Sequence, residues 1–302
     1  MEVNRRQFIW SVGLGTAAGL SPHDSQAAQA SNSDDWLAML TDLSLCVGCR
    51  KCEWACKDVN GLPNQPIETF EDKSVFEHKR RTTQEAHTVV NRFPPTKPGG
   101  NPVDVKIQCM HCIEPACASS CLVKALKKTP DGPVIYDETV CIGCRYCMVA
   151  CPFLIPTYTY DEPYRPVVRK CSMCFERVTK EGKIPACAGI CPVEAITFGK
   201  RKDLIALARK KIQENPTQYV DHIYGEHEVG GTSWLYVSPK PFEDLGFPTN
   251  LGTIPYPELT KGFLSSVPLV LTIWPAMLMG CYAFTKRREE LTNSIPGEPD
   301  HE

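Results

Sequence analysis

The sequence has almost no excess charge of either sign: 33 Lys and Arg oppose 35 Asp and Glu over 302 residues, a formal net charge of -2. Because the two signs are interspersed, no basic field is available for nucleic acid, and we expect no nucleic-acid partner. The sequence also lacks a phosphate-binding loop, a dinucleotide fingerprint and a constellation of Ser, His and an acid. These absences predict a chain without a catalytic site of its own.

Residues 4–20 combine a twin arginine with an apolar stretch that is too short to cross a bilayer. Phe8 follows the arginine pair, and "AQA" at 28–30 provides small residues for cleavage. These features predict a twin-arginine export signal over residues 1–30, and the alternative is a basic N-terminus ahead of a core helix. Such signals export folded proteins, which suits a protein whose cofactor is inserted before export.

A second apolar segment occupies residues 262–284 and contains no charged residue. At about 1.5 Å per residue it can cross about 30 Å of hydrocarbon, which predicts one transmembrane helix. The basic run 286–288 follows it, whereas only Lys261 stands directly before it. The positive-inside rule therefore predicts a cytoplasmic tail over 285–302 and a body on the periplasmic face of the inner membrane. The alternative is a buried helix of a soluble domain.

Cysteine, in contrast, is abundant, because the chain has 17 and all but one form four groups of four. The groups are Cys46, Cys49, Cys52 and Cys56; Cys109, Cys112, Cys117 and Cys121; Cys141, Cys144, Cys147 and Cys151; and Cys171, Cys174, Cys187 and Cys191. The first and third are spaced C-x2-C-x2-C-x3-C, the second C-x2-C-x4-C-x3-C and the fourth C-x2-C-x12-C-x3-C. Cys281 lies alone in the apolar segment, where it is expected to be apolar filling.

Three kinds of site compete for these groups. Disulfides would have to close very small loops repeatedly, which has no stabilising rationale in a chain with ample apolar residues. Zinc usually takes two C-x2-C pairs separated by a spacer, a pattern that only the fourth group resembles. Cysteines at i, i+3 and i+6 followed by a fourth are the bacterial ferredoxin run, in which the fourth ligates a neighbouring cluster. The spacing favours 4Fe-4S clusters, with a zinc-stabilised, non-redox interaction protein as the alternative from a different class.

Residues near the cysteines agree with the iron-sulfur interpretation. Gly48 and Gly143 lie between the first two cysteines of their groups, where a missing side chain permits positive φ and close approach to a cluster. Pro152 and Pro192 follow terminal cysteines, as in bacterial ferredoxins. Residues 122–140 predict a short helix, a strand, a turn and a second strand, and the helix and strand repeat after the fourth group. The chain is therefore predicted to be α+β with two ferredoxin-like units.

The remaining segments carry less information. Residues 57–108 contain "FPPTKPGGNP" near their end and predict irregular surface structure that is available for partner contact. Residues 202–214 have helical apolar spacing and predict an amphipathic helix packed on the core. His222 and His227 are expected to be structural rather than haem or metal ligands.

These groups in this order, with both ends of the chain, resemble the iron-sulfur electron-transfer subunits of membrane-bound oxidoreductases. This is the family of the dimethyl sulfoxide reductase and formate dehydrogenase beta subunits. The segments "LCVGCRKC", "QCMHCIEPAC", "VCIGCRYCMVACP" and "GEHEVGGT" carry the likeness, which covers nearly the whole chain. Within the family, the chain resembles the HybA-type subunits of membrane-bound periplasmic nickel-iron hydrogenases.

The resemblance implies two nested ferredoxin-like units, an outer one from residues 31–108 and 152–200 and an inner one from 109–151, with 201–261 as a C-terminal extension. It also implies four 4Fe-4S clusters whose iron is held by all four groups. Cluster 1 takes Cys46, Cys49, Cys52 and Cys191; cluster 2 takes Cys171, Cys174, Cys187 and Cys56; cluster 3 takes Cys109, Cys112, Cys117 and Cys151; cluster 4 takes Cys141, Cys144, Cys147 and Cys121.

The function implied by the resemblance is electron transfer through clusters 1, 2, 3 and 4, in that order. The partners are a periplasmic catalytic subunit, with a hydrogenase favoured, and an integral membrane quinone-interacting subunit. An export signal combined with a C-terminal anchor favours the hydrogenase type, since formate dehydrogenase beta subunits typically lack the signal. The alternative is the equivalent subunit of a formate dehydrogenase, another molybdenum oxidoreductase or a multihaem cytochrome complex.

Four basic residues lie beside cluster cysteines in the sequence, namely Arg50, Lys51, Arg145 and Lys170. Because a cluster with its thiolates is negatively charged, a nearby cation raises its reduction potential. The alternative for each is an ordinary solvated surface charge.

Metal analysis separates the iron-sulfur and zinc interpretations. We expect broad absorbance near 400 nm and about sixteen irons per chain, since four 4Fe-4S clusters hold four irons each. Stoichiometric zinc without iron would contradict the iron-sulfur interpretation.

Overall fold

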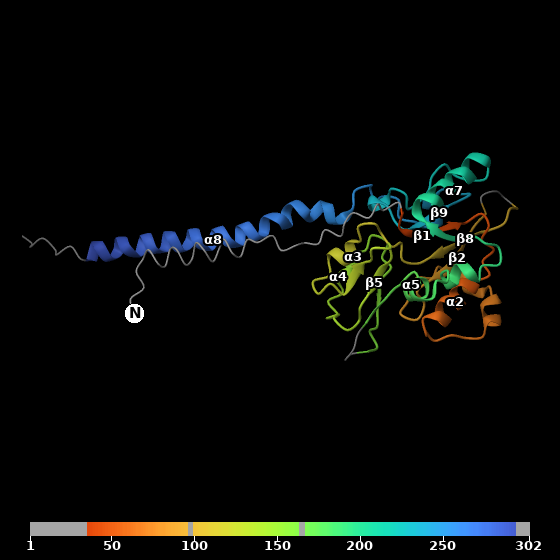
Figure 1. Ribbon diagram of the computed structural model, residues 1–302, viewed down its shortest axis with the longest axis horizontal. Helices are drawn as coiled ribbons and strands as arrows, with labels where there is room; N and C mark the ends of the chain where they lie inside the picture. The colour runs from red at the N-terminus through yellow and green to blue at the C-terminus, as the bar shows by residue number, and fades with distance from the viewer. Residues whose placement is uncertain (1–34, 96–98, 163–166, 294–302) are drawn as a thin grey trace, which may run out of the picture.

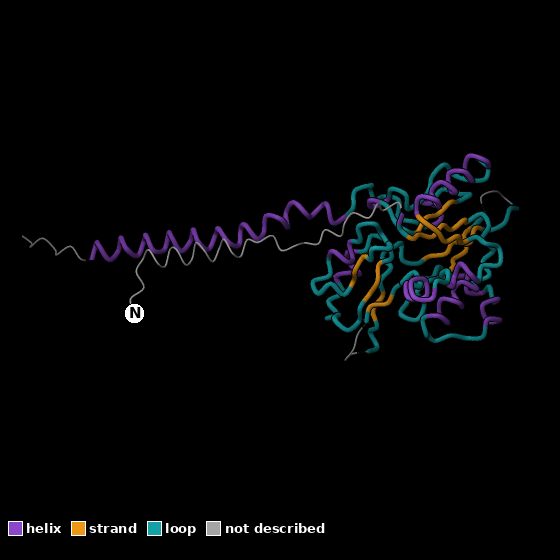
Figure 2. Tube along the Cα trace, in the orientation of Figure 1, coloured by secondary structure: helices purple, strands orange, loops and turns teal. Residues whose placement is uncertain are grey.

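The computed structural model describes residues 35–95, 99–162 and 167–293. The predicted export signal and the last part of the predicted tail, 294–302, lie outside the described residues. A rounded body of short strands and helices carries one long helix that projects away from it (Figure 1). All the strands drawn in orange lie in the body (Figure 2).

A three-stranded sheet forms the centre of the body. Its strands are β8 (Ile196–Lys200), β1 (Leu37–Asp42) and β9 (Trp234–Val237), in that order. The central strand β1 is antiparallel to β8, with Leu37 opposite Lys200, and parallel to β9, with Met39 opposite Trp234. Helix α7 (Arg201–Glu214) packs on this sheet through Leu204 and other buried residues. The predicted amphipathic helix is therefore confirmed.

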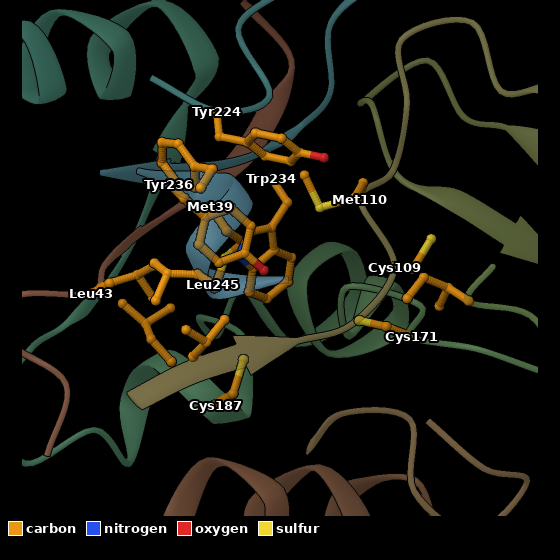
Figure 3. Packing of buried hydrophobic residues seen from close by; sticks show 14 of the residues in the cluster. Met39, Leu43, Cys109, Met110, Cys171, Cys187, Tyr224, Trp234, Tyr236 and Leu245 are labelled. Carbon is orange, nitrogen blue, oxygen red and sulfur yellow. The ribbon is translucent and has the colours of Figure 1, made fainter. Parts of the chain in front are cut away.

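The other face of the sheet supports the main hydrophobic core. Met39 and Leu43 pack there with Trp234, Tyr236 and Tyr224, all of which are essentially inaccessible to solvent. Figure 3 shows Cys109, Cys171 and Cys187 at the edge of this cluster of buried residues. Cysteines of the second and fourth groups are thus part of the main hydrophobic core.

The pairing of strands and the contacts between helices define two units of the same design. In the outer unit β1 pairs with β8, and helix α2 (Lys51–Val59) contacts helix α6 (Ala186–Gly189). In the inner unit β4 (Leu126–Lys128) pairs with β5 (Val134–Tyr136), and α3 (Ala116–Ser119) contacts α4 (Tyr146–Ala150). Each unit thus joins the strand that precedes one cysteine group to the strand that follows another. The predicted α+β class with ferredoxin-like units is confirmed.

In the second and fourth groups the short helix lies before the last cysteine rather than after it. The helix predicted after Cys121 is a turn, and the equivalent segment after Cys191 is also a turn. Lys124 and Glu194 have φ of 53° and 51° at these places. A left-handed residue cannot continue a right-handed helix, so the chain changes direction and enters the next strand.

The prediction of irregular structure over 57–108 is wrong for two segments. Strand β2 (Val89–Phe93) pairs antiparallel with β3 (Val103–Ile107), with Val89 opposite Ile107. The Pro- and Gly-rich stretch lies between the two strands in the sequence, and the 3-10 helices η2 (Ile67–Glu71) and η3 (Ser74–Glu77) precede the hairpin. Most residues of both strands are buried on both faces. Strand β3 alternates apolar and polar residues, but its polar members Asp104 and Lys106 are buried as well.

The remaining elements connect these parts. They are β6 (Thr157–Tyr158) paired antiparallel with β7 (Val168–Arg169), α5 (Phe175–Glu181), η4 (Glu228–Gly230) and η5 (Phe242–Leu245).

Helix α8 (Tyr256–Asn293) is the projecting rod of Figure 1. It contains the whole predicted segment 262–284 and continues beyond it at both ends. Among the described helices it alone is long and apolar enough to cross a membrane, and its most apolar stretch is not buried in the body. It therefore can anchor the chain to a membrane, whereas a core helix of a soluble domain would be covered.

Candidate iron-sulfur centres

Three of the four predicted cysteine sets line cavities of their own. Site 1 is lined by Cys46, Cys49, Cys52 and Cys191; site 2 by Cys56, Cys171, Cys174 and Cys187; site 4 by Cys121, Cys141, Cys144 and Cys147. The cavities measure about 390, 350 and 310 Å³, counting the space at their mouths. In each, three cysteines come from one group and the fourth from a distant group, as the resemblance implied.

The fourth set, site 3, consists of Cys109, Cys112, Cys117 and Cys151. Burial raises the pKa of the Cys112 thiol well above its usual value, and proximity to Cys109, Cys151 and Cys117 raises it further. The structure therefore brings these four thiols together, although Cys151 belongs to a different group from the other three.

The thiols are arranged neither as disulfides nor as ligands of a single ion. All 17 cysteines lie among the described residues and are free thiols. Within the same residues, no three His, Cys, Asp or Glu side chains converge as closely as a single metal ion requires. Four thiols spread around a cavity suit a larger body such as a 4Fe-4S cluster, which supplies reversible one-electron redox chemistry when bound.

Backbone and amide N–H groups point at several of the sulfurs. Ala125 N donates to Cys121 Sγ at 3.2 Å, and Met173 N donates to Cys171 Sγ at 3.3 Å. Asn60 Nδ2 lies 3.7 Å from Cys56 Sγ. Such hydrogen bonds stabilise negative charge on the sulfur, which favours the thiolate and the reduced cluster.

The two predicted glycines have the backbone conformation expected of them. Gly48 and Gly143 have φ of 65° and 69°, and Arg50 and Arg145, two residues later, have φ of 58° and 62°. This repeat folds the segment between the first two cysteines tightly over sites 1 and 4. At Gly48 the space is also filled, since an added Cβ would lie 2.5 Å from Asp104 Oδ2.

The four basic candidates differ in their surroundings. Arg50 is buried and lines site 1, where Nη1 donates to Asp72 O at 3.0 Å. Lys170 is also buried, and its Nζ donates to Cys171 O at 3.0 Å. Arg145 lines site 4 with its guanidinium over the Tyr158 ring. Lys51 is partly exposed and lines none of the three cavities. Arg50 and Lys170 are therefore not solvated surface charges.

A buried ionic network beside site 1 was not predicted from the sequence. Glu53 accepts hydrogen bonds from Arg80 Nη2 at 2.6 Å and from Val90 N at 2.6 Å. Asp104 accepts from Arg92 Nε at 2.9 Å and from Arg92 Nη2 at 3.0 Å. The bond from Val90 to Glu53 attaches β2 to α2 and so to the first cysteine group, whereas the Arg92–Asp104 pair joins β2 to β3 within the hairpin. The interpretation of 57–108 as irregular structure predicted neither.

Lys106 was missed for the same reason. It lies on β3, is 2% exposed, and lines both site 1 and site 2. The run of β-branched residues Val103, Val105 and Ile107 around it was the available signal for a strand.

The two histidines considered as possible haem or metal ligands lie at the surface. His222 Nε2 lies 2.7 Å from Glu228 Oε1 at the surface, and the His227 side chain is largely exposed. Cys281 is exposed on α8, remote from the four sites in the sequence.

Paired cysteine sets in two nested α+β units define an iron-sulfur protein of the ferredoxin type. The family described as 4Fe-4S dicluster domain matches residues 104–201. A protein of Nitratidesulfovibrio vulgaris is 48% identical over 297 residues, which cover 96% of this chain and 79% of that protein. The Hydrogenase-2 operon protein HybA of Escherichia coli O157:H7 is 35% identical over 277 residues, 82% of this chain and 84% of that protein.

The nitrate-inducible formate dehydrogenase iron-sulfur subunit of Escherichia coli K12 is 33% identical over 206 residues, 67% of each chain. The chain therefore belongs to the family of iron-sulfur electron-transfer subunits of oxidoreductase complexes, with HybA-like proteins among its relatives. Its cofactors are 4Fe-4S clusters, and its role is electron transfer.

The close packing at Gly48 gives a prediction with a matched control. Gly61→Ala should cost about 1 kcal/mol, because Gly61 also has φ of 61° but an added Cβ meets nothing within 4 Å. Gly48→Ala should cost a further ~1–3 kcal/mol through its clash with Asp104, and should also lower iron content. Thermal unfolding and iron analysis of both variants measure the difference. Equal losses of stability and full iron in both would contradict the role given to Asp104.

Proposed function

We propose that sites 1 to 4 hold four 4Fe-4S clusters, each on the four cysteines that surround it. The chain itself makes and breaks no bonds, and conducts electrons between a periplasmic catalytic subunit and an integral membrane subunit that interacts with quinone. A hydrogenase is the favoured catalytic partner. The name of the HybA relative supports this choice, and the formate dehydrogenase names of other relatives make that enzyme the second candidate.

The observation that carries this proposal is the exposure of site 4 next to α8. Cys144 is exposed, and a collar of exposed apolar residues surrounds it: Leu122, Ile142, Tyr146 and Val149, the last 84% exposed. Exposed apolar patches of this kind mark interaction surfaces. Helix α3 of the same unit contacts α8, and α3 and α4 lie on the side of the body from which α8 projects (Figure 1). A membrane subunit beside α8 would thus meet the collar.

The order 1, 2, 3, 4 is supported by contacts between neighbouring sites. A thiol of one site helps to raise the pKa of a thiol in the next: Cys187 that of Cys52 for sites 1 and 2, Cys109 that of Cys171 for sites 2 and 3, and Cys147 that of Cys117 for sites 3 and 4. The α2 end of the outer unit, which carries the first group, lies away from α8 (Figure 1). The catalytic subunit would therefore bind near site 1.

The proposed topology combines the two ends of the chain. The twin arginine at residues 5–6 supports export, and the basic run 286–288 at the far end of α8 supports a cytoplasmic C-terminus. The body then lies on the periplasmic face of the inner membrane, anchored by α8.

Purification of the intact complex from membranes tests the partners. We expect a hydrogenase catalytic subunit and an integral membrane subunit to co-purify with the chain and to be identified by mass spectrometry. Recovery with a formate dehydrogenase catalytic subunit would replace the favoured partner. Recovery of the chain alone, without iron, would contradict the proposed function.

The crossed ligation makes a second prediction. Cys151→Ser should remove or alter cluster 3 and leave cluster 4 intact, because Cys151 lies with the second cysteine group although it belongs to the third. Cys144→Ser should alter a different electron paramagnetic resonance signal, and Cys281→Ser should alter none. If Cys151→Ser and Cys144→Ser changed the same signal, each group would hold its own cluster and the crossed assignment would be wrong.

A further inference from the structure

Lys106 lies between two of the sites. Among the residues that the structure describes, it is the one that lines both the cavity of site 1 and the cavity of site 2. The thiols that influence it electrostatically come from both sites, Cys52 from site 1 and Cys187 from site 2 among them. Its positive charge therefore lies between the two proposed clusters.

The side chain is held there by a closed set of hydrogen bonds. Lys106 Nζ donates to Gln108 Oε1 at 2.8 Å and lies 4.4 Å from the centre of the Trp234 ring. Gln108 Nε2 donates to Tyr236 Oη at 2.5 Å, and Tyr236 Oη donates to Lys106 O at 2.8 Å. All four residues are at most 2% exposed. The ammonium therefore has a fixed location and no access to water.

The ammonium also has no carboxylate partner, unlike the other cations near site 1. Arg50 is paired with Glu53, and Arg92 with Asp104. Across the described ranges, the oxygen partner of Lys106 Nζ is a neutral amide, and no carboxylate forms an ion pair with it. A buried charge without a counter-charge is strongly unfavourable. The negative charge that offsets it must come from the thiolates and clusters of sites 1 and 2.

We propose that Lys106 is a shared counter-charge that raises the reduction potentials of clusters 1 and 2 together. This inference rests on the proposed ligation of those clusters. Reduction adds one negative charge to a cluster, and a fixed cation in a medium of low dielectric stabilises the reduced form. Because the same ammonium faces both cavities, it acts on both clusters in the same direction.

The difference in reduction potential between clusters 1 and 2 therefore stays small, so the first electron transfer within the chain changes the free energy little. A cation beside only one cluster would make that cluster a trap for the electron, whereas a shared cation lowers the energy of the electron on both. Lys106 therefore acts by holding a positive charge at a fixed place between the two clusters, and it touches no substrate.

The test is a redox titration of the intact complex, followed by electron paramagnetic resonance. In Lys106→Met and Lys106→Gln, two of the four one-electron steps should move to lower potential, each by about tenfold in the ratio of oxidised to reduced cluster, which is about 59 mV. The other two steps should stay where they are. Lys106→Arg, which keeps the charge, should restore wild-type potentials.

Lys51→Met is the matched control, because Lys51 is next to Cys52 in the sequence but is partly exposed and lines neither cavity. Removing the Lys51 charge should leave all four reduction potentials nearly unchanged, since water screens that charge. Iron content is measured in every variant. Full iron with unmoved steps, or a shift of only one step or of all four alike, would overturn the inference.

Loss of clusters in all three Lys106 variants, Lys106→Arg included, would show a structural role for the side chain and would also overturn it. A wild-type complex without about sixteen irons would instead contradict the proposed function itself.

Discussion

The fold depends on one constraint: four cysteine sulfurs must surround each cavity, and they come from segments that are far apart in the chain. Site 1 joins Cys46 to Cys191, and site 2 joins Cys56 to Cys171. Closing such long loops costs conformational entropy, which the pairing of β1 with β8 and the contact of α2 with α6 help to offset. The inner unit meets the same demand with β4, β5, α3 and α4. The nested order of the units follows, because the outer pair of groups encloses the inner pair in the sequence.

The cysteine sites also decide where charge is buried. A cluster and its thiolates carry negative charge, so a protein that encloses several of them must supply positive charge close by. This chain does so in two ways. Arg50, which is buried, and Arg92, which is partly exposed, lie near site 1 with carboxylate partners, so they contribute structure as well as charge. Lys106 is buried between sites 1 and 2 without such a partner, which leaves its charge available to the sites themselves.

The two units differ in size and in their contact with α8, so the two ends of the body are distinct. The outer unit contains the central sheet and the largest hydrophobic core, whereas the inner unit is smaller, has an exposed apolar collar and contacts α8. Thiols of sites 2 and 3 interact electrostatically from the outer unit to the inner one, and thiols of sites 3 and 4 interact within the inner unit. An electron-transfer subunit needs such a series of adjacent sites, and the body has this form.

The sequence by itself determined the four cysteine groups, the ferredoxin-like α+β class and the long apolar segment, since ligand spacing and hydrophobic length are local properties of the chain. Gly48 and Gly143 were also predictable, because a tight turn between cysteines demands positive φ. The crossed grouping of cysteines was implied only by resemblance, since spacing does not say which distant group supplies a fourth sulfur. The hairpin β2–β3 and Lys106 emerged only in the tertiary structure. Strand β3 alternates apolar and polar residues, yet Asp104 and Lys106 are buried with the rest, and whether a lysine lies in water or between two cavities depends on what packs over it.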